Sequence, residues 1–289
     1  MGLINVAYRS IEAEGAVSVL DFEKNGQDPA VGNQDQKQEQ SLAGSIRVLS
    51  GNLWWGRADS EGLVDLIREY QVDVFAAQEL GFENAEAISS ELPYGCLEPD
   101  EQYQGMGIAL RRPGAYERIP LYHRDARRVV LQPADWPGLE CPIDLVNVHF
   151  HAPHALWPFP SVLVRWRQAR DLDKYIDANP SDSRLIVGDY NATPQWPLYQ
   201  RFARRFSDGA IIAAQTEGRS VEATWGPTPG SPRVLRIDHA LVRGLEVESF
   251  KVVEIRGSDH SALLFDCTPA AVGGPALAAV DADEDPTND

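Results

Sequence analysis

Cysteine is scarce in this chain of 289 residues, which contains only Cys96, Cys141 and Cys267, all far apart in the sequence. An odd number of isolated cysteines argues against a disulfide framework and against a Cys-x-x-Cys zinc site. A reducing compartment suits such a chain, and we expect the cytoplasm. The N-terminus fits this expectation, because it lacks a basic leader with a long apolar segment, and Val6 stands where a myristoylation signal needs Ser or Thr.

Long apolar runs are also missing. None approaches the roughly 18 residues of a membrane helix, so we expect no membrane span. A composition of 43% apolar and 24% charged residues is that of an ordinary globular protein. The length suits one large two-sheet domain or two small ones; we favour one domain with tails, and we expect a monomer.

Lysine is rare too, with 4 residues, and the formal net charge is -17. Such an acidic surplus repels polyanions and disfavours tight, sequence-independent binding to DNA. Part of it lies at the ends, since residues 1–44 hold 7 acids and 3 bases, and residues 270–289 hold 5 acids and no base. A metal bound at an active site would offset more of the negative charge locally.

The two ends also differ from the middle in pattern. Residues 21–44 are polar and lack periodicity, so we expect residues 1–44 to form a flexible N-terminal arm, although residues 11–20 could add a short element. Residues 269–289 are rich in Ala, Gly, Pro and acids, and are expected to form a disordered acidic tail. Residues 45–268 between them are expected to form the folded domain.

Apolar patterns predict a strand–helix–strand unit at the start of this domain. A strand at 46–50 ends in Gly51-Asn52, a helix follows with apolar residues at 63, 66, 67 and 70, and a strand at 72–77 ends in Gln78-Glu79 before a helix at 83–91. Further strands are predicted at 105–110, 127–131, 143–150, 223–225, 236–242, 250–255 and 261–266. A helix that ends before Pro180 is predicted to have an apolar face of Leu163, Trp166, Ala169, Leu172 and Ile176. Many strands with fewer helices favour two packed sheets with outer helices, in the α/β class.

Three apolar residues at 185–187 predict a buried strand, and Gly188 allows the chain to turn after it. Open α/β sheets place their chemistry at such strand ends, where Asp189 and Asn191 would stand. One carboxylate and one amide in the same cleft suit the orientation of a water and a phosphoryl oxygen. Both residue types also favour turns through local hydrogen bonds, so a purely structural role is the alternative.

Polar residues interrupt the ends of several apolar strands in a particular order. The series is Asn52, Gln78-Glu79, Asn147-x-His149, Asp189-x-Asn191, Arg236-Ile237-Asp238 and Ser258-Asp259-His260. Over roughly residues 45–266, it resembles the metal-dependent endonuclease/exonuclease/phosphatase superfamily, which includes pancreatic deoxyribonuclease and the exonuclease III-type nucleases. The resemblance implies that residues 45–268 are a catalytic domain, a four-layer α/β sandwich with one active site between the edges of two sheets.

The resemblance also implies a metal site. Glu79 matches a ligand of Mg²⁺, or Mn²⁺ in its place, and carboxylate oxygens suit such hard cations. Asn52 and Asp259 match positions beside the same metal, where an amide and a second carboxylate complete or orient its ligands. The alternatives are a surface glutamate and two turn residues.

The same resemblance assigns reacting groups. Asp189 matches the residue that orients or deprotonates the attacking water, and Asn191 matches the amide that holds this water and a phosphoryl oxygen. His260 matches an imidazole that contacts the phosphate, and Asp238 matches the carboxylate that fixes its tautomer and favours its charged form. A buried structural His–Asp pair is the alternative.

Two further positions would contact substrate. His149 matches a histidine that stabilises charge on the transferring phosphoryl group. Tyr103 precedes a Gly-x-Gly strand, as in a family segment, and either contacts substrate or packs in the core. The family pattern is not complete, because Ala262 stands where proline is usual and His239 where an aromatic residue is frequent. Neither departure removes a reacting group, so they affect the assignment of the substrate more than that of the catalytic residues.

Other readings of local motifs remain open. His149, His151 and His154 have the spacing of a transition-metal cluster, although no Cys or acidic partner lies nearby in sequence. The arginines at 201, 204 and 205 either contact nucleic-acid phosphates or lie on a solvated helix face with core aromatics between them. Loops at 92–103 and 153–160 are expected to set selectivity, with 157–160 as a substrate-facing rim or as packing over the sandwich edge.

The resulting hypothesis is a divalent-metal-dependent phosphoesterase that hydrolyses phosphodiester bonds, with nucleic acid as the leading substrate. The alternative within enzymes is a phosphatase or phosphodiesterase for a small phosphorylated metabolite or lipid headgroup, which the acidic charge and the few lysines favour. A catalytically silent binding module is a third reading. The intact set of acids, amides and histidines argues against it.

Overall fold

The computed structural model describes residues 44–153 and 161–270, which belong to the compact unit Ser41–Asp289. Four predicted features lie outside the described residues: the arm, the acidic tail, His154 and the rim at 157–160. Only residues 44, 269 and 270 of the arm and tail are described. Within the described part, no helix is both long and apolar enough to cross a membrane.

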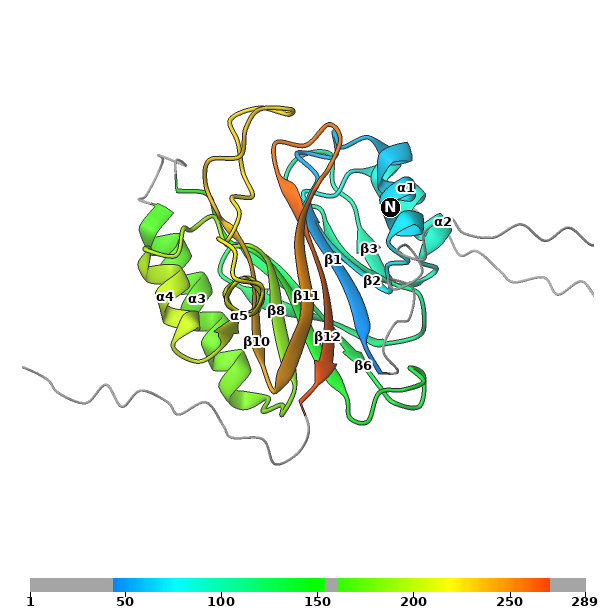
Figure 1. Cartoon of the computed structure of the whole chain (residues 1–289). Helices are drawn as coiled ribbons and strands as arrows, with labels where there is room; N and C mark the ends of the chain where they lie inside the picture. The colour runs from blue at the N-terminus through cyan, green and yellow to red at the C-terminus, as the bar shows by residue number, and fades with distance from the viewer. Residues whose placement is uncertain (1–43, 154–160, 271–289) are drawn as a thin grey trace, which may run out of the picture. The chain divides into compact units, whose positions relative to one another are not determined.

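The strands form two six-stranded mixed sheets (Figure 1). The first sheet has the order β11 (Leu245–Glu254), β12 (Ser261–Pro269), β1 (Ile46–Asn52), β2 (Val74–Gln78), β4 (Met106–Leu110) and β3 (Tyr94–Glu98). The second has the order β5 (Ala115–Leu121), β6 (Arg124–Leu131), β7 (Ile143–His149), β8 (Arg184–Asp189), β10 (Asp238–Arg243) and β9 (Ser207–Asp208).

The five described helices are α1 (Ser60–Glu69), α2 (Phe82–Glu91), α3 (Ser161–Ala178), α4 (Pro197–Ala203) and α5 (Gly209–Glu217). Three hydrophobic clusters show how they pack. One cluster joins the facing sides of the two sheets, one joins the first sheet to α1 and α2, and one joins the second sheet to α3 and α4. The layers are therefore helix, sheet, sheet and helix, which confirms the predicted four-layer α/β sandwich.

Alternating side chains allow one strand to contribute to the hydrophobic clusters on both faces of its sheet. In β1, Val48 faces the cluster between the sheets and Leu49 faces the cluster beneath α1. In β2, Val74 likewise faces the cluster between the sheets and Phe75 faces the cluster beneath α1. Side chains of a strand alternate between the two faces of its sheet, so a continuous apolar run is needed where both faces are covered.

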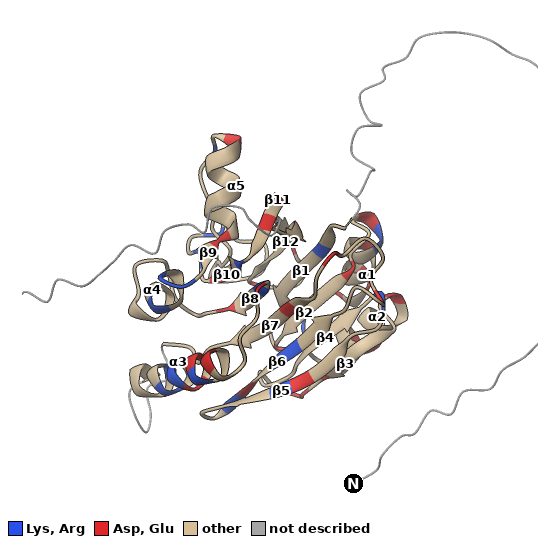
Figure 2. Ribbon diagram, turned by 90° about the horizontal axis from the view of Figure 1, so that it is seen from below, with Lys and Arg blue, Asp and Glu red and all other residues tan. Residues whose placement is uncertain are grey.

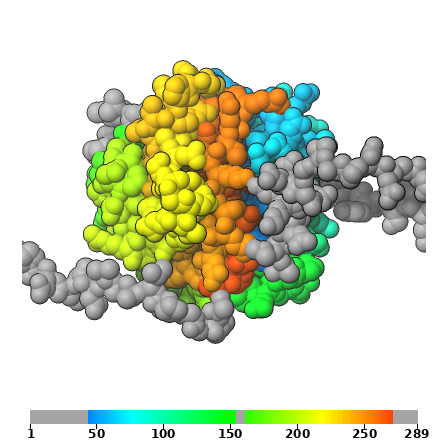
Figure 3. All heavy atoms as spheres, in the orientation of Figure 1, coloured from blue at the N-terminus to red at the C-terminus, as the bar shows by residue number. Residues whose placement is uncertain are grey.

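Strand pairing brings the polar strand ends to one edge. β1 and β2 are parallel, with Asn52 opposite Gln78, and β7 and β8 are parallel, with His149 opposite Asp189. The antiparallel partner β10 places Asp238 opposite Asp189. From the side seen in Figures 1 and 3, β11 and β12 lie between the blue-to-cyan N-terminal part and the green-to-yellow part.

Several predicted elements differ from the structure. The segment 223–225 makes only isolated bridges through Trp225, to Leu235 and His260, instead of a strand. The predicted loop 92–103 contains β3, an edge strand whose residues are exposed or only partly buried. The edge strand β5, the two-residue β9 and the helix α5 were not predicted. Edge strands bury few side chains and give no clear alternation.

The predicted apolar face of α3 is wrong in its first turns. Leu163 and Trp166 are 48% and 51% exposed, whereas Arg165 and Gln168 are buried. The buried polar pair has a structural reason, because Gln168 accepts a hydrogen bond from the N–H of His151 and Arg165 donates to backbone carbonyls of the site loops. The remainder of the face, Ala169, Leu172 and Ile176, is buried as predicted.

The arginine-rich segment around α4 packs as a solvated helix face. Phe202 and Phe206 are buried, and Arg201 and Arg205 both pair with Asp173 of α3. This confirms the core-aromatic reading of the segment, since neither phenylalanine is free to stack on a base.

Candidate active site

Polar side chains of both sheets meet where the strand ends of the two sheets come together. The first sheet and its adjoining loops supply Asn52, Glu79, Asp259 and His260, and the second supplies His149, Asp189, Asn191 and Asp238. Hydrogen bonds or ion-pair distances join members of the two sets directly, as between Asn52 and Asp189. The predicted site residues other than Tyr103 are thus brought into one cluster.

Amide side chains tie the two sheets together beneath this cluster. Asn147 of β7 donates to the carbonyl oxygens of Ala77 and Gly107 in the opposite sheet, at 2.9 Å in both cases. Gln78 of β2 donates to the Asn147 side-chain oxygen at 2.7 Å. These buried bonds cross the sheet interface, and they fix the spacing between the groups that each sheet contributes.

Asp189 ends β8 and is held by amides on several sides. Its Oδ1 accepts the backbone N–H of Asn191 at 2.7 Å, and its Oδ2 accepts the side-chain amides of Asn191 and Asn52 at 2.9 and 3.1 Å. Gly188 was predicted to allow a turn, but it lies within β8 between Val148 and His239. Glycine is needed there because its φ is +137° and a Cβ would lie 2.0 Å from the carbonyl oxygen of Val148. The carboxylate is therefore immobilised in a single orientation.

The environment of Asp189 makes it a candidate base. Burial, and then the negative charge of Asp238, raise its pKa to about 7, while His260 and the Asn191 N–H act in the opposite direction. A general base works best when its pKa lies near the operating pH.

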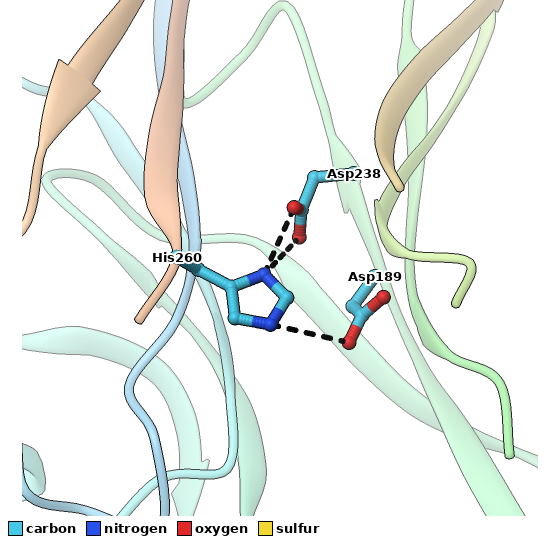
Figure 4. A group of neighbouring side chains, drawn as sticks. All are labelled: Asp189, Asp238 and His260. Carbon is cyan, nitrogen blue, oxygen red and sulfur yellow. Dashed lines mark hydrogen bonds and ion pairs between the residues drawn. The ribbon is translucent and has the colours of Figure 1, made fainter. Parts of the chain in front are cut away.

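Asp238 and His260 form a buried pair across the sheet interface (Figure 4). The His260 Nδ1 lies 2.9 and 3.1 Å from the two Asp238 oxygens, and Thr224 donates its hydroxyl to Asp238 at 2.6 Å. The His260 Nε2 lies 4.0 Å from Asp189 Oδ2. Burial alone would lower the pKa of His260, but the Asp238 and Asp189 carboxylates outweigh it and raise that pKa to about 10. The imidazole is thus cationic at neutral pH.

Glu79 follows β2 with a φ of +51°, a left-handed conformation that points to a local constraint. Its Oε2 accepts the N–H of Trp55 at 2.9 Å, and its Oε1 lies 3.6 Å from His149 Nε2. Burial raises the pKa of Glu79, and the nearby Asp259 carboxylate raises it further. A bound cation would relieve both effects, which is the chemistry expected of a metal ligand.

Asp259 carries an unpartnered oxygen. Its Oδ2 accepts the indole N–H of Trp225 at 3.0 Å, whereas its buried Oδ1 has no hydrogen-bond partner. A buried carboxylate oxygen without a donor is costly unless something electropositive binds it. Together with Glu79 and the Asn52 amide, it gives an all-oxygen donor set that fits a divalent cation such as Mg²⁺ or Mn²⁺.

A second set of possible ligand atoms is less suited to such a cation. Asp189, Asp238 and His260 offer atoms within 4.8 Å of one another, the one such group found in the described residues. However, Asp238 and His260 already satisfy each other, and imidazole suits softer metals than Mg²⁺. The group does not contain His149 or His151, so it gives no support to the alternative of a histidine cluster.

His149, at the end of β7, lies between two carboxylates. Its Nε2 is 3.6 Å from Glu79 Oε1 and also 3.6 Å from Asp189 Oδ2, and its buried Nδ1 has no hydrogen-bond partner. Burial lowers the pKa of His149 well below its usual range, and the charges of Arg124 and His260 add to this. The ring is therefore neutral and can offer one N–H to the site.

Two arginines beside the site were not predicted. Arg124 donates to the His149 carbonyl at 3.2 Å, and its pKa is lowered by burial although Glu79 and Asp189 attract its charge. Arg165 donates to the carbonyls of His151 and Asn191, and one of its buried nitrogens is unpartnered. Arg124 opens β6, three residues before the strand predicted at 127–131, and nothing in the local pattern indicates its role.

Tyr103 stands at the rim rather than in the core. It is partly buried and belongs to none of the three hydrophobic clusters. Its ring centroid lies 6.2 Å from that of Trp55, and the Arg124 guanidinium carbon lies 5.5 Å from its ring centroid. These contacts disfavour the core-packing alternative.

Solved structures share this fold. An endonuclease/exonuclease/phosphatase from Bacteroides vulgatus aligns with a TM-score of 0.62 at 17% identity, over 78% of this chain and 99% of that one. The human Nocturnin catalytic domain with bound sulfate anion aligns with a TM-score of 0.56 at 20% identity, over 79% and 96%. The Bacteroides thetaiotaomicron mannosyl-6-phosphatase Bt3783 aligns with a TM-score of 0.56 at 14% identity, over 77% and 99%. At these identities the likeness shows the fold alone.

Sequence comparison identifies the family. No curated protein sequence matches the chain. The sequence profile of the Endonuclease/Exonuclease/phosphatase family, however, matches residues 49–260, which span the strand ends of both sheets. The chain therefore belongs to the endonuclease/exonuclease/phosphatase family, whose enzymes are divalent-metal-dependent phosphoesterases.

Proposed function

We propose that the chain hydrolyses phosphodiester bonds with the help of Mg²⁺ or Mn²⁺, and that nucleic acid is its leading substrate. The observation that carries this proposal is the juxtaposition of Asp189, a carboxylate with a pKa near 7, and His260, a cation held 4.0 Å away. A proton acceptor beside a fixed positive charge suits attack by water on an anionic phosphorus centre.

In this mechanism Glu79, with Asn52 and Asp259 beside it, would hold the cation, which would supply Lewis-acid polarisation of the phosphoryl oxygens. Asp189 orients the attacking water and accepts its proton as the oxygen–phosphorus bond forms. Asn191, whose amide already bonds Asp189, holds the water and a phosphoryl oxygen.

The histidines offset the charge that develops on the phosphoryl group. His260 directs its Nε2–H toward a phosphoryl oxygen, while Asp238 binds Nδ1 and thereby fixes the orientation of the ring. His149 offers a neutral N–H from the other side. The bond to the leaving oxygen then breaks in line with the attacking water.

A small phosphorylated metabolite or lipid headgroup is the second candidate substrate. The formal net charge of -17 and the presence of only 4 lysines favour it, since a polyanion would be repelled. The similarity in fold to a mannosyl-6-phosphatase is compatible with this candidate. We further propose that the enzyme acts as a monomer in the cytoplasm, because one chain supplies every group of the site and its three cysteines are free.

A substrate screen tests the proposal. Purified protein would be incubated with Mg²⁺, Mn²⁺ or chelator, and with plasmid, single-stranded DNA, RNA, phosphomonoesters and lipid headgroup diesters. Metal-dependent cleavage of nucleic acid is the expected result. Cleavage of small esters alone would reject nucleic acid as the substrate and support the second candidate. Binding of an ester without turnover would favour a silent binding module.

A further inference from the structure

The loop between β1 and α1 passes directly beside the proposed metal ligand. Trp54, Trp55 and Gly56 have φ values of +48°, +58° and +69°, so three consecutive residues are left-handed. Two bulky residues rarely adopt this conformation in succession, and such strain persists only where surrounding contacts impose it.

Those contacts come from the active site itself. The Asn52 side-chain oxygen accepts the N–H of Trp54 at 2.9 Å, Glu79 Oε2 accepts the N–H of Trp55 at 2.9 Å, and the Glu79 carbonyl accepts the N–H of Gly56 at 2.8 Å. The loop is thus fastened to the same residues that are proposed to hold the cation. The backbone of Trp55 is therefore bonded directly to the proposed metal ligand Glu79.

The indole of Trp55 lies outside the three hydrophobic clusters of the described residues. It is 51% exposed. The guanidinium carbon of Arg57 lies 5.5 Å from its ring centroid, and Arg57 has no carboxylate partner within residues 44–153 and 161–270. The ring centroid of Tyr103 lies 6.2 Å from that of Trp55, and the guanidinium group of Arg124 lies over the Tyr103 ring.

We propose that Trp55 is a stacking platform for a nucleobase next to the scissile phosphate, and that Arg57, which has no carboxylate partner among the described residues, contacts the same nucleotide. An exposed indole and a planar guanidinium bind the face of a base without regard to its sequence. This inference rests on the proposed function and narrows its substrate to esters that carry a base.

The charge distribution favours a short substrate. Residues 45–269 hold 31 acids and 23 bases, and Figure 2 shows both blue and red segments on α3. A long polyanion needs a continuous basic track, whereas a mononucleotide or dinucleotide needs only the site and one platform.

A kinetic comparison tests the platform. The substrates are the dinucleotide dTpdT and two analogues in which a tetrahydrofuran replaces one or the other nucleoside. We expect loss of one of the bases to lower kcat/KM by about tenfold to a hundredfold, mainly through KM, which is the scale of base–aromatic stacking. Trp55→Ala should lower kcat/KM for dTpdT to the level of that analogue and leave the analogue itself unaffected.

Matched variants keep the comparison specific. Trp55→Phe should retain most of the preference for the base, and Trp166→Ala, which removes an indole of equal exposure from α3, should change nothing. Equal losses on dTpdT and on both analogues after Trp55→Ala would overturn the proposal, because the indole would then act on the sugar or on Glu79.

A binding measurement separates this inference from the proposed function. Calorimetry with the Asp189→Asn protein and Mg²⁺ would compare thymidine 5′-monophosphate with 2-deoxyribose 5-phosphate. The nucleotide should bind about tenfold to a hundredfold more tightly, and Trp55→Ala should abolish the difference. Equal affinities would overturn the platform. An enzyme that hydrolyses no diester but retains the preference would instead reject the phosphoesterase and keep the platform.

Discussion

Asp189 is held by three amide contacts, from the backbone and side chain of Asn191 and from the side chain of Asn52. An asparagine at position 189 has the same shape but cannot accept a proton from water. We expect Asp189→Asn to lower kcat by about a hundredfold or more, the scale of a general base, with the fold retained. Steady-state kinetics and circular dichroism would check this.

Asp182 is exposed, and the matched variant Asp182→Asn should leave kcat unchanged. If Asp189→Asn retained full turnover, water activation would have to be assigned to another residue.

Asp238 sets the protonation of His260, and this can be measured directly. The carboxylate raises the pKa of the imidazole to about 10, so Asp238→Asn should lower that pKa toward its ordinary value near 6.5. NMR titration of the His260 ring without metal would follow the shift. A fall in the pKa of His260 is specific to the loss of the Asp238 charge, because a residue that only packs against the ring would leave this pKa high when replaced.

The same pair should act as a unit in catalysis. We expect Asp238→Asn and His260→Ala each to depress kcat, and the double variant to cost much less than the product of the two effects. Independent, multiplying effects would show that Asp238 does not act through His260.

The Glu79 carboxylate carries the metal prediction. Chelator should abolish turnover, and Glu79→Gln should raise the Mg²⁺ concentration needed for half-maximal rate, because a neutral amide binds a hard cation poorly. Calorimetric titration with Mg²⁺ gives a second measure that does not need substrate. Full activity in chelator would contradict the metal mechanism.

At the scale of elements, Asp208 connects β9, α4, α5 and β10. It caps α5 through the N–H of Ala210, accepts the Tyr199 hydroxyl at 2.6 Å, and pairs with Arg236 at 2.8 Å. Burial alone would raise the pKa of Asp208, but His239, Arg236 and Tyr199 together hold it well below its usual range.

The Asp208 carboxylate makes the free energy of unfolding depend on pH in the acidic range. A folded-state pKa below the unfolded value of about 3.9 stabilises the fold at pH values above the latter, and this stabilisation is lost as the pH falls toward the folded value. Asp208→Asn should therefore reduce the free energy of unfolding by about 3–5 kcal/mol at pH 7, the cost of breaking a buried pair, and by less at pH 3. Urea unfolding at both values would check this, and a pH-independent difference would contradict it.

Central elements were predictable and peripheral ones were not. Strands such as β1, β2 and β8 are buried on both faces, so their apolar runs are continuous in sequence. The edge strands β3 and β5 gain their conformation from a single neighbour and have mixed burial, which leaves no period to detect. In α3 the helix itself was predictable, but Arg165 and Gln168 displaced Leu163 and Trp166 from the buried face because loop backbones needed donors and acceptors.

The candidate site was predicted in part for a similar reason. Asp189 and Glu79 each stand two residues after an apolar run, which predicted their place at strand ends, whereas their proposed roles came from the family resemblance. Arg124 lies at the first position of β6, and Trp55 lies in a loop with left-handed backbone conformation. No local sequence pattern predicts that either residue lies beside the site.

At the scale of the whole chain, the described domain contains every group of the proposed mechanism. β12 extends to Pro269 and Ala270 bonds Gly244, so a truncation should begin after Ala270. Removal of residues 1–43 and 271–289 is expected to leave kcat and the thermal midpoint unchanged, because their sequences lack periodic apolar faces.

Differential scanning fluorimetry and kinetics would test this truncation. A fall of the midpoint by more than about 4 °C, which exceeds 1 kcal/mol for a domain of 150–250 residues, would show that residues 11–20 stabilise the domain.

The pairing of β1 with β12 joins the two ends of the described domain, with Ile46 opposite Cys267. Asp259 and His260 stand immediately before β12, while Asn52 ends β1. During synthesis, β1 therefore lacks its partner β12 until the segment that carries Asp259 and His260, the last two residues of the candidate site, has been made. We therefore expect the proposed phosphoesterase activity to appear only after residues 259–269 have been synthesised.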